Sequence, residues 1–188
     1  MVVKVTIELE DADLRHFRRA IKNARRTVRD ADEADVISAA EGVIHKVKAS
    51  DVPDFILDRL QTLELMTVMV RDQEWGLPKA ERIRVLSALA YFADPEDIIP
   101  DDIPGLGFLD DAIMVELVFR ELKHELEAYR DFCAYRENYD NQAKSKTARE
   151  QRELRLEAKR HSLHERMQRR KLRDGRHQAR SDSIAPLW

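Results

Sequence analysis

The segment from Asp94 to Asp111 holds the side chains whose types and spacing suggest chemistry most directly. It contains six aspartates and one glutamate, together with three prolines and two glycines. Carboxylate oxygens are preferred ligands of Mg²⁺ and Ca²⁺, which take about six or more oxygen ligands each. A divalent-metal site, and with it a metal-dependent enzyme or a metal-binding protein, is therefore one interpretation. The candidate ligands are Asp97, Asp101, Asp110 and Asp111.

The same carboxylates have a structural use that competes with metal binding. Short acidic side chains accept hydrogen bonds from nearby backbone N–H groups in turns. Asp110 and Asp111 precede an expected helix, where a carboxylate caps free N–H groups at the positive end of the dipole. The prolines keep the segment out of a helix, and its isoleucines and leucines can hold it against a core. We therefore expect a rigid connector without a cofactor, with Mg²⁺ or Ca²⁺ as the alternative.

Basic residues near the C-terminus suggest a second kind of chemistry, the binding of phosphate groups. Between Lys159 and Arg173 there are seven lysines or arginines and a single acid, Glu165. Such side chains neutralise phosphates and release counterions, which gives sequence-independent binding. Because this stretch has no Phe, Tyr or Trp, stacking on single-stranded bases is not supported. The predicted polyanion-binding residues are Lys159, Arg160, Arg166, Arg169, Arg170, Lys171 and Arg173.

The expected partner of this basic stretch is nucleic acid, a ribosome or an acidic face of another protein. The alternative is an arm that only improves solubility or contacts a second copy of the chain. A further basic run lies between Leu14 and Arg29, where seven lysines or arginines occur without one acid. These cations either form an exposed basic face or pair with acids elsewhere in the acidic body, such as those between Asp30 and Asp35.

No catalytic residue is predicted. Cys133 falls on the apolar seam of an expected helix, where a buried cysteine behaves as a small apolar residue. The serines lack the glycine-flanked turn of a nucleophile elbow, and no glycine-rich phosphate loop precedes a helix. The sequence therefore favours a non-enzymatic binding or adaptor protein.

These residues must be positioned by an all-α fold. Apolar side chains spaced by three and four residues predict five helices, the last running from Asp111 to Glu137. Short connections between helices are typical of a bundle. Asp32 is an expected N-cap of the second helix, and Gly76 and Pro78 are expected to end the third helix and begin the fourth.

A short N-terminal strand is predicted ahead of the first helix. Val3, Val5, Ile7 and Leu9 alternate with polar residues, a period of two that is typical of a half-buried strand. A lone strand leaves backbone groups unpaired, so it could pair with the same strand of a second copy and give a homodimer. The alternative is an extended lead-in that pairs with nothing.

Charge divides the chain into two predicted regions. Residues 141–188 hold fourteen basic and six acidic residues, a net charge of +8, which leaves 19 basic and 30 acidic residues, or −11, for residues 1–140. We expect an acidic helical domain over 1–140. The basic extension over 141–188 is expected to be helical or flexible, because its apolar residues are too sparse for a good buried face.

Several features favour a cytoplasmic protein. The one cysteine cannot form an internal disulfide, which fits a reducing compartment. The N-terminus lacks a signal-peptide pattern, and no window approaches the roughly 18 apolar residues of a spanning helix. The alternative is a peripheral membrane protein that attaches through its basic extension.

The segment 94–113, DPEDIIPDDIPGLGFLDDAI, resembles the signature of the YkvA-like family, a bacterial domain of unknown function. The resemblance implies no activity that can be transferred. In many members of that family, the segments on either side of the motif are apolar and resemble membrane helices. The corresponding segments here, residues 78–92 and 112–129, carry charged side chains. We therefore expect no transmembrane segment and a structural role for the motif. The residues that match the signature are Pro95, Asp97, Ile99, Pro100, Asp101, Ile103, Pro104, Gly107, Asp110 and Asp111.

Overall fold

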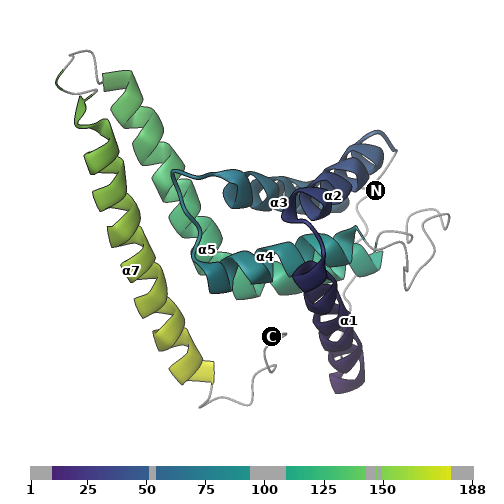
Figure 1. The fold of residues 1–188 in the computed structure, drawn as a ribbon. Helices are drawn as coiled ribbons and strands as arrows, with labels where there is room; N and C mark the ends of the chain where they lie inside the picture. Colours follow the sequence, from purple (N-terminus) through teal and green to yellow (C-terminus); the bar gives the residue numbers. More distant parts are fainter. Residues whose placement is uncertain (1–9, 51–53, 94–108, 143–146, 148–149, 179–188) are drawn as a thin grey trace, which may run out of the picture.

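The computed structural model describes residues 10–50, 54–93, 109–142, 147 and 150–178. Within these ranges the chain forms six helices and no strand (Figure 1). The predicted all-α class is therefore confirmed, while the predicted strand over residues 3–9 lies outside the described residues. The helices are α1 (Asp11–Asp30), α2 (Glu33–Lys48), α3 (Asp54–Arg71), α4 (Lys79–Phe92), α5 (Leu109–Gln142) and α7 (Arg152–Gln178).

Local sequence signals set several helix ends. The carboxylate of Asp32 accepts a hydrogen bond from the backbone N–H of Ala34 at 2.8 Å, which caps α2 as predicted. α3 ends at Arg71, before the predicted stop at Gly76. Gly76 instead adopts a left-handed conformation with φ +56° in the loop that follows, a region that glycine enters without steric penalty. Pro78 is the N-cap of α4. The loop between α3 and α4, residues 72–78, is called the α3–α4 loop below.

α4 lies at the centre of the molecule. It packs against α1, α2, α3 and α5, and Val85, Leu86 and Leu89 on it are at most 1% exposed. α1 covers one side of α4 with an apolar stripe that includes Leu14 and Ile21, 2% and 1% exposed. The opposite side of α1 faces solvent, so α1 is an amphipathic helix with one buried face.

α5 is longer than predicted, and its C-terminal half forms an antiparallel hairpin with α7 (Figure 1). α7 packs against α5, and its buried side chains belong to the same hydrophobic cluster as those of the other helices. The basic C-terminal stretch is therefore helical over residues 152–178. α1 and α7 lie on opposite sides of the molecule (Figure 1).

Candidate functional site

α7 is held against α5 by a short apolar seam. Leu156, Leu163 and Met167 are 4%, 2% and 1% exposed. Their spacing of seven and four residues places them on one side of the helix. The sequence suggested too few apolar residues for a buried face, but three are enough here because aromatic and charged side chains complete the contact.

Trp75 in the α3–α4 loop is the aromatic centre of that contact. Its side chain is 0% exposed, with ring centroids 5.7 Å from Tyr129 and 5.3 Å from Phe132 on α5. The His164 ring of α7 meets it edge-on at 4.3 Å. Trp75 therefore joins three segments that are far apart in the sequence.

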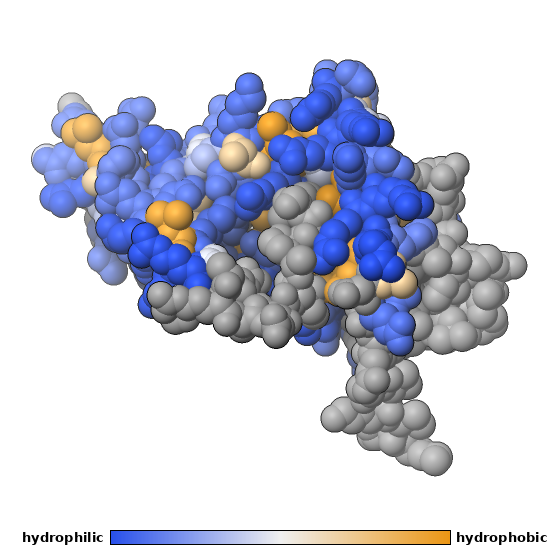
Figure 2. Space-filling view, turned by 90° about the horizontal axis from the view of Figure 1, so that it is seen from below, coloured by the Kyte–Doolittle hydropathy of each residue, from blue (hydrophilic) through white to orange (hydrophobic). Residues whose placement is uncertain are grey.

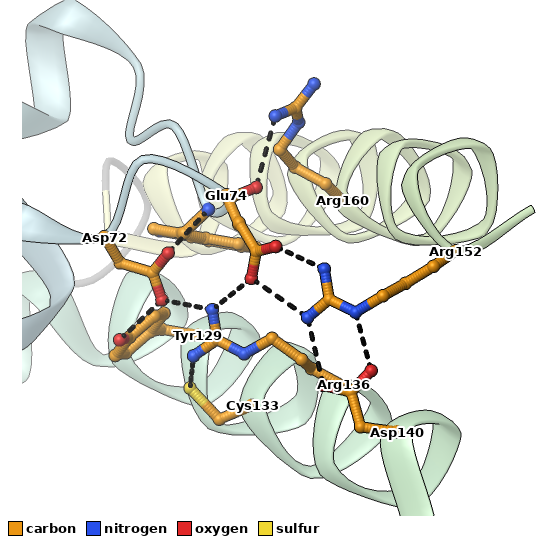
Figure 3. Close-up of polar contacts among 9 residues, drawn as sticks. Asp72, Glu74, Tyr129, Cys133, Arg136, Asp140, Arg152 and Arg160 are labelled. Carbon is orange, nitrogen blue, oxygen red and sulfur yellow. Dashed lines mark hydrogen bonds and ion pairs between the residues drawn. The ribbon is translucent and has the colours of Figure 1, made fainter. Parts of the chain in front are cut away.

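Asp72 is the centre of a polar network that joins the α3–α4 loop to α5 (Figure 3). Its carboxylate accepts hydrogen bonds from the Trp75 backbone N–H at 3.1 Å and from the Tyr129 hydroxyl at 3.0 Å. It also pairs with Arg136 at 2.8 Å. Burial, followed by the neighbouring Cys133 and Asp72, raises the pKa of Tyr129, so this hydroxyl stays a neutral donor. Cys133 is half-buried, and Arg136 donates to its sulfur at 3.8 Å.

Arg152 extends this network to α7 (Figure 3). Its guanidinium donates to the Glu74 carboxylate and to Asp140, with 2.6 Å between Nε and Oδ1 of Asp140. Hydrogen bonds from Arg152 and Arg136 lower the pKa of Glu74, and Arg152 likewise lowers the pKa of Asp140. Arg160 donates to the backbone carbonyl of Glu74 at 3.1 Å. The arginines of α7 therefore fasten the α3–α4 loop.

Near the other end of α7, a half-buried lysine lies between two buried glutamates. Glu81 on α4 and Glu125 on α5 are 5% and 0% exposed. The Lys171 ammonium lies 2.9 Å from Glu81 and 2.5 Å from Glu125, and Gln168 donates to Glu81 at 3.1 Å. Burial alone would raise the pKa of Glu81, but Lys171 outweighs it and the pKa is lowered. These contacts connect α7 with α4 and α5.

A histidine and an aspartate add a further polar contact between α5 and α7. His124 is buried on α5, and its Nε2 lies 2.8 Å from Asp174 on α7. Lys123 pairs with the same carboxylate at 2.8 Å. Hydrogen bonds from Lys123 and His124 lower the pKa of Asp174 to about 2. Asp174 therefore remains ionised and attached to α5 across the neutral pH range.

The structure places most of the predicted polyanion-binding residues of α7 against the body. Besides Arg160 and Lys171, Arg166 pairs with Asp131, and Arg170 pairs with Glu127 at 2.6 Å. Both acids lie on α5. The counter-charges of these four cations are therefore supplied by the chain itself.

The remaining three predicted residues are less tightly engaged. The Lys159 ammonium lies 5.1 Å from the centroid of the Tyr135 ring, a cation–π geometry. Arg169 and Arg173 have side chains that are 70% and 68% exposed, and each pairs with an acid of α7 itself at 3.9 Å. This outer face of α7 therefore mixes positive and negative charge.

α1 presents the opposite arrangement. Six of its seven lysines and arginines are exposed, and none of the six forms an ion pair with any residue that the structure describes. Arg18, the seventh, is half-buried and engaged in another interaction. We call the six the α1 basic face: Arg15, Arg19, Lys22, Arg25, Arg26 and Arg29.

Two of the acids between residues 30 and 35 are used elsewhere. Asp32 caps α2, and Glu33 accepts from Arg82 of α4, with 2.7 Å between Nε and Oε2. The pairing with acids between 30 and 35 that the sequence suggested is therefore not formed by these six side chains within the described part of the chain.

The acidic connector lies largely outside the described residues. This holds for Asp97 and Asp101 and for the family-motif residues up to Gly107. Asp110 and Asp111 begin α5, but their side chains are not described. Metal binding and the structural role of the motif thus remain predictions. Where the chain is described, no three His, Cys, Asp or Glu side chains are grouped as a metal would require.

Sequence reasoning did not identify Trp75, Glu81 or Glu125 as residues of one interface. One signal was available: the expected turn contains a tryptophan. Such a large apolar side chain is seldom left in solvent, so its burial against another element could have been predicted. For the two glutamates no local signal existed, because each lies on a helix whose pattern gives no reason for a buried charge.

Residues 81–117, from α4 into α5, match the family described as "Protein of unknown function (DUF1232)". The chain is also similar to the "Uncharacterized membrane protein YkvA" of Bacillus subtilis (strain 168), 36% identical over 74 residues that cover 37% of this chain and 70% of that protein. No solved structure matches. Among the described helices, none combines the length and apolar content needed to cross a bilayer. The resemblance of residues 94–113 to the YkvA-like family is thus confirmed: the chain belongs to that family, and its residues 81–117 match the DUF1232 domain.

Proposed function

We propose that the protein is a non-enzymatic adaptor that binds a polyanionic partner, and that the α1 basic face carries the contact. The observation that supports this best is the set of six exposed cations without ion pairs in the described part of the chain. Clustered lysines and arginines create a positive potential that attracts anions and speeds their association. The class of partner includes nucleic acid, a ribosome and an acidic face of another protein.

α7 supports polyanion binding less well than α1. If Lys171 bound a polyanion instead, Glu81 and Glu125 would stay buried without their counter-charge. Breaking a buried ion pair in this way costs about 3–5 kcal/mol of stability. The more exposed pairs of α7 are individually weak, each about 0.2–1 kcal/mol. Several of them would nevertheless have to break together. We therefore assign the cations of α7 mainly to holding α7 in place.

The Bacillus subtilis relative favours a second candidate, because it is named as a membrane protein. An anionic bilayer attracts each nearby lysine or arginine by about 1 kcal/mol. The α1 basic face could therefore hold the protein on a membrane surface without a spanning helix. Either kind of partner is present in the cytoplasm, where we propose that the protein acts.

Heparin chromatography tests the proposed function, because heparin is a generic polyanion. Two variants remove three cations each. The α1 variant is Arg19→Gln, Lys22→Gln and Arg26→Gln, and the α7 variant is Arg155→Gln, Arg169→Gln and Arg173→Gln, all at exposed positions. We expect the wild type and the α7 variant to elute at similar salt, and the α1 variant to elute much earlier. Failure of the wild type to be retained, or loss of retention in the α7 variant alone, would refute the proposal.

A further inference from the structure

The cations of α1 occupy one flank of the exposed surface. At about 100° per residue, Arg15, Arg19, Lys22, Arg25, Arg26 and Arg29 fall within an arc of roughly 120° of the helix circumference. The other exposed flank carries His16, Asn23 and Thr27, and the exposed acids of α1, Asp13 and Asp30, lie at the two ends of the helix. From this one-sided placement we infer that the α1 basic face binds the phosphate backbone of duplex nucleic acid. This inference rests on the proposed function and narrows it to one partner.

The basic face has the length of a backbone contact. From Arg15 to Arg29 the cations recur once in every helical turn, a distance of about 21 Å at 1.5 Å per residue. Phosphates advance about 3.4 Å along the axis per nucleotide of one strand. One strand winds around the duplex, so a straight row cannot follow many consecutive phosphates of it. The row is, however, longer than the roughly 12 Å width of the major groove of DNA, so it can bridge the phosphates on the two sides of a groove.

The row is also rigid before any ligand arrives. The stripe that anchors α1 on α4 includes Leu14, Phe17 and Ile21, which are at most 5% exposed. A preformed helix does not lose backbone entropy on binding, in contrast to a basic segment that folds on its ligand. The cations are thus presented at fixed spacing along one line.

The composition of the face suits the binding of phosphate. Five of its six cations are arginines. A guanidinium is planar and donates two parallel hydrogen bonds to one phosphate, which a lysine ammonium does not do.

A duplex fits better than a single strand. Proteins that hold single strands stack the bases on exposed aromatic rings. The only Phe, Tyr or Trp of α1 is Phe17, and it is 5% exposed in the core. Backbone contacts alone suit a duplex, in which the bases are already stacked on each other.

A bilayer surface fits less well than a duplex. Helices that lie in the membrane interface bury an apolar face among the lipids, but the apolar face of α1 is buried on α4. Among the described residues, the exposed large apolar side chains are Val68, Leu154 and Leu172, and none lies on α1. Figure 2 shows one side of the molecule on which apolar residues form only small separate spots among hydrophilic ones.

The test measures binding of the full chain to four probes over a range of salt concentrations. The probes are a double-stranded RNA and a double-stranded DNA of equal length and sequence, the corresponding single strand, and vesicles that contain phosphatidylserine. We expect both duplexes, or one of them, to bind more tightly than the single strand and the vesicles. The two duplexes separate an RNA ligand from a DNA ligand, since both offer the same phosphate chemistry.

The salt dependence identifies the residues. For duplex DNA, log K falls with log[salt] by about 0.9 for each neutralised phosphate. The α1 variant should therefore lower the magnitude of this slope by about 2 to 3, and the α7 variant should leave it unchanged. A further variant, Arg19→Lys and Arg26→Lys, keeps the charge and should keep the slope while weakening the affinity, because bidentate contacts are lost.

The outcomes are separable from those of the proposed function. Retention on heparin without preferential duplex binding would overturn the inference and leave the proposed function standing. Tighter binding to vesicles than to duplexes would assign α1 to a membrane surface instead. An unchanged salt slope in the α1 variant, with far-UV circular dichroism equal to the wild type, would remove α1 from the nucleic-acid contact.

Discussion

α1 and α7 are both arginine-rich helices on the surface of one small protein, yet their charges have different surroundings. On α7, Arg166, Arg170 and Lys171 meet acids of α4 and α5. On α1, six exposed cations have no ion pair in the described part of the chain. A basic stretch therefore identifies a ligand surface only after the face of the neighbouring helix is known.

The difference follows from what each helix packs against. α1 lies on α4 and buries the apolar stripe that includes Leu14, Phe17 and Ile21. α7 lies on α5, whose facing side carries Glu125, Glu127 and Asp131. The internal acids thus neutralise α7 and leave α1 available, and substitutions in the two helices should have different consequences.

Removal of the cation that pairs with the two buried glutamates should have the largest effect on stability. Lys171→Met keeps the length of the side chain but leaves Glu81 and Glu125 buried side by side without their ammonium. We expect the free energy of unfolding to fall by about 3–5 kcal/mol, measured by urea denaturation at neutral pH. Arg169→Met, at an exposed position of the same helix, is the control and should change it by no more than about 0.5 kcal/mol. A loss below about 1 kcal/mol for Lys171→Met would contradict the buried geometry.

The apolar seam of α7 should have the next largest effect. Leu163→Ala removes a side chain that is 2% exposed, whereas Leu172→Ala removes one that is 65% exposed on the same helix. Truncation of a buried leucine to alanine costs about 2–5 kcal/mol, and we expect about 3 kcal/mol here because the seam has only three apolar residues. Leu172→Ala should be nearly neutral in the same denaturation experiment. Equal effects of the two substitutions would mean that α7 is not docked in solution.

Acidification should weaken the α7 contact before carboxylates titrate. Burial and the nearby Arg160 lower the pKa of His164, while Glu81 acts weakly in the opposite direction. The unfolded chain therefore binds a proton at a higher pH than the folded chain does. Stability is fully present above the ordinary pKa of about 6.5 and is lost progressively as the pH falls below it.

The measurement is the free energy of unfolding between pH 7.5 and pH 5, which we expect to decrease in the wild type. His164→Gln should make this decrease smaller. His161→Gln is the matched control, because the His161 side chain is 76% exposed. If His161→Gln and His164→Gln flatten the pH profile equally, burial of His164 is not the cause.

Removal of cations from α1 should have the smallest effect on stability. The three substitutions of the α1 variant lie at exposed positions without ion pairs in the described part of the chain. Exposed substitutions of this kind change the free energy of unfolding by no more than about 0.5 kcal/mol each. Thermal unfolding of the purified variant measures this. A large destabilisation would show that the α1 basic face has an internal partner.

The parts of the fold that could be predicted are those with local causes. The stripe through Leu14 and Ile21, the cap at Asp32 and the turn at Gly76 depend on residues a few positions apart. The periodicity of apolar residues and the preference of certain residues for helix ends and turns are visible in the sequence itself. The basic character of α1 could be predicted in the same way, because its cations lie on one helix.

The parts that could not be predicted depend on the register between distant helices. Lys171 lies in a basic run, and only the position of α7 against α4 and α5 shows that it pairs with two buried glutamates. Trp75 lies in a short loop, and only the α5–α7 hairpin explains its burial. Which acid neutralises which cation depends on how the helices pack. The sequence alone therefore predicted polyanion binding for several cations that form ion pairs within the chain.

The most direct test of the account is the melting temperature with and without heparin. It compares the wild type, the α1 variant and a variant of paired α7 cations, Arg152→Gln, Arg166→Gln and Arg170→Gln. A ligand that binds the folded state raises the melting temperature. We expect the α1 variant to melt like the wild type and to lose the increase caused by heparin, and the paired-cation variant to melt lower and to keep the increase. The reverse pattern would show that the charges of α7 are the free ones, and would contradict the account.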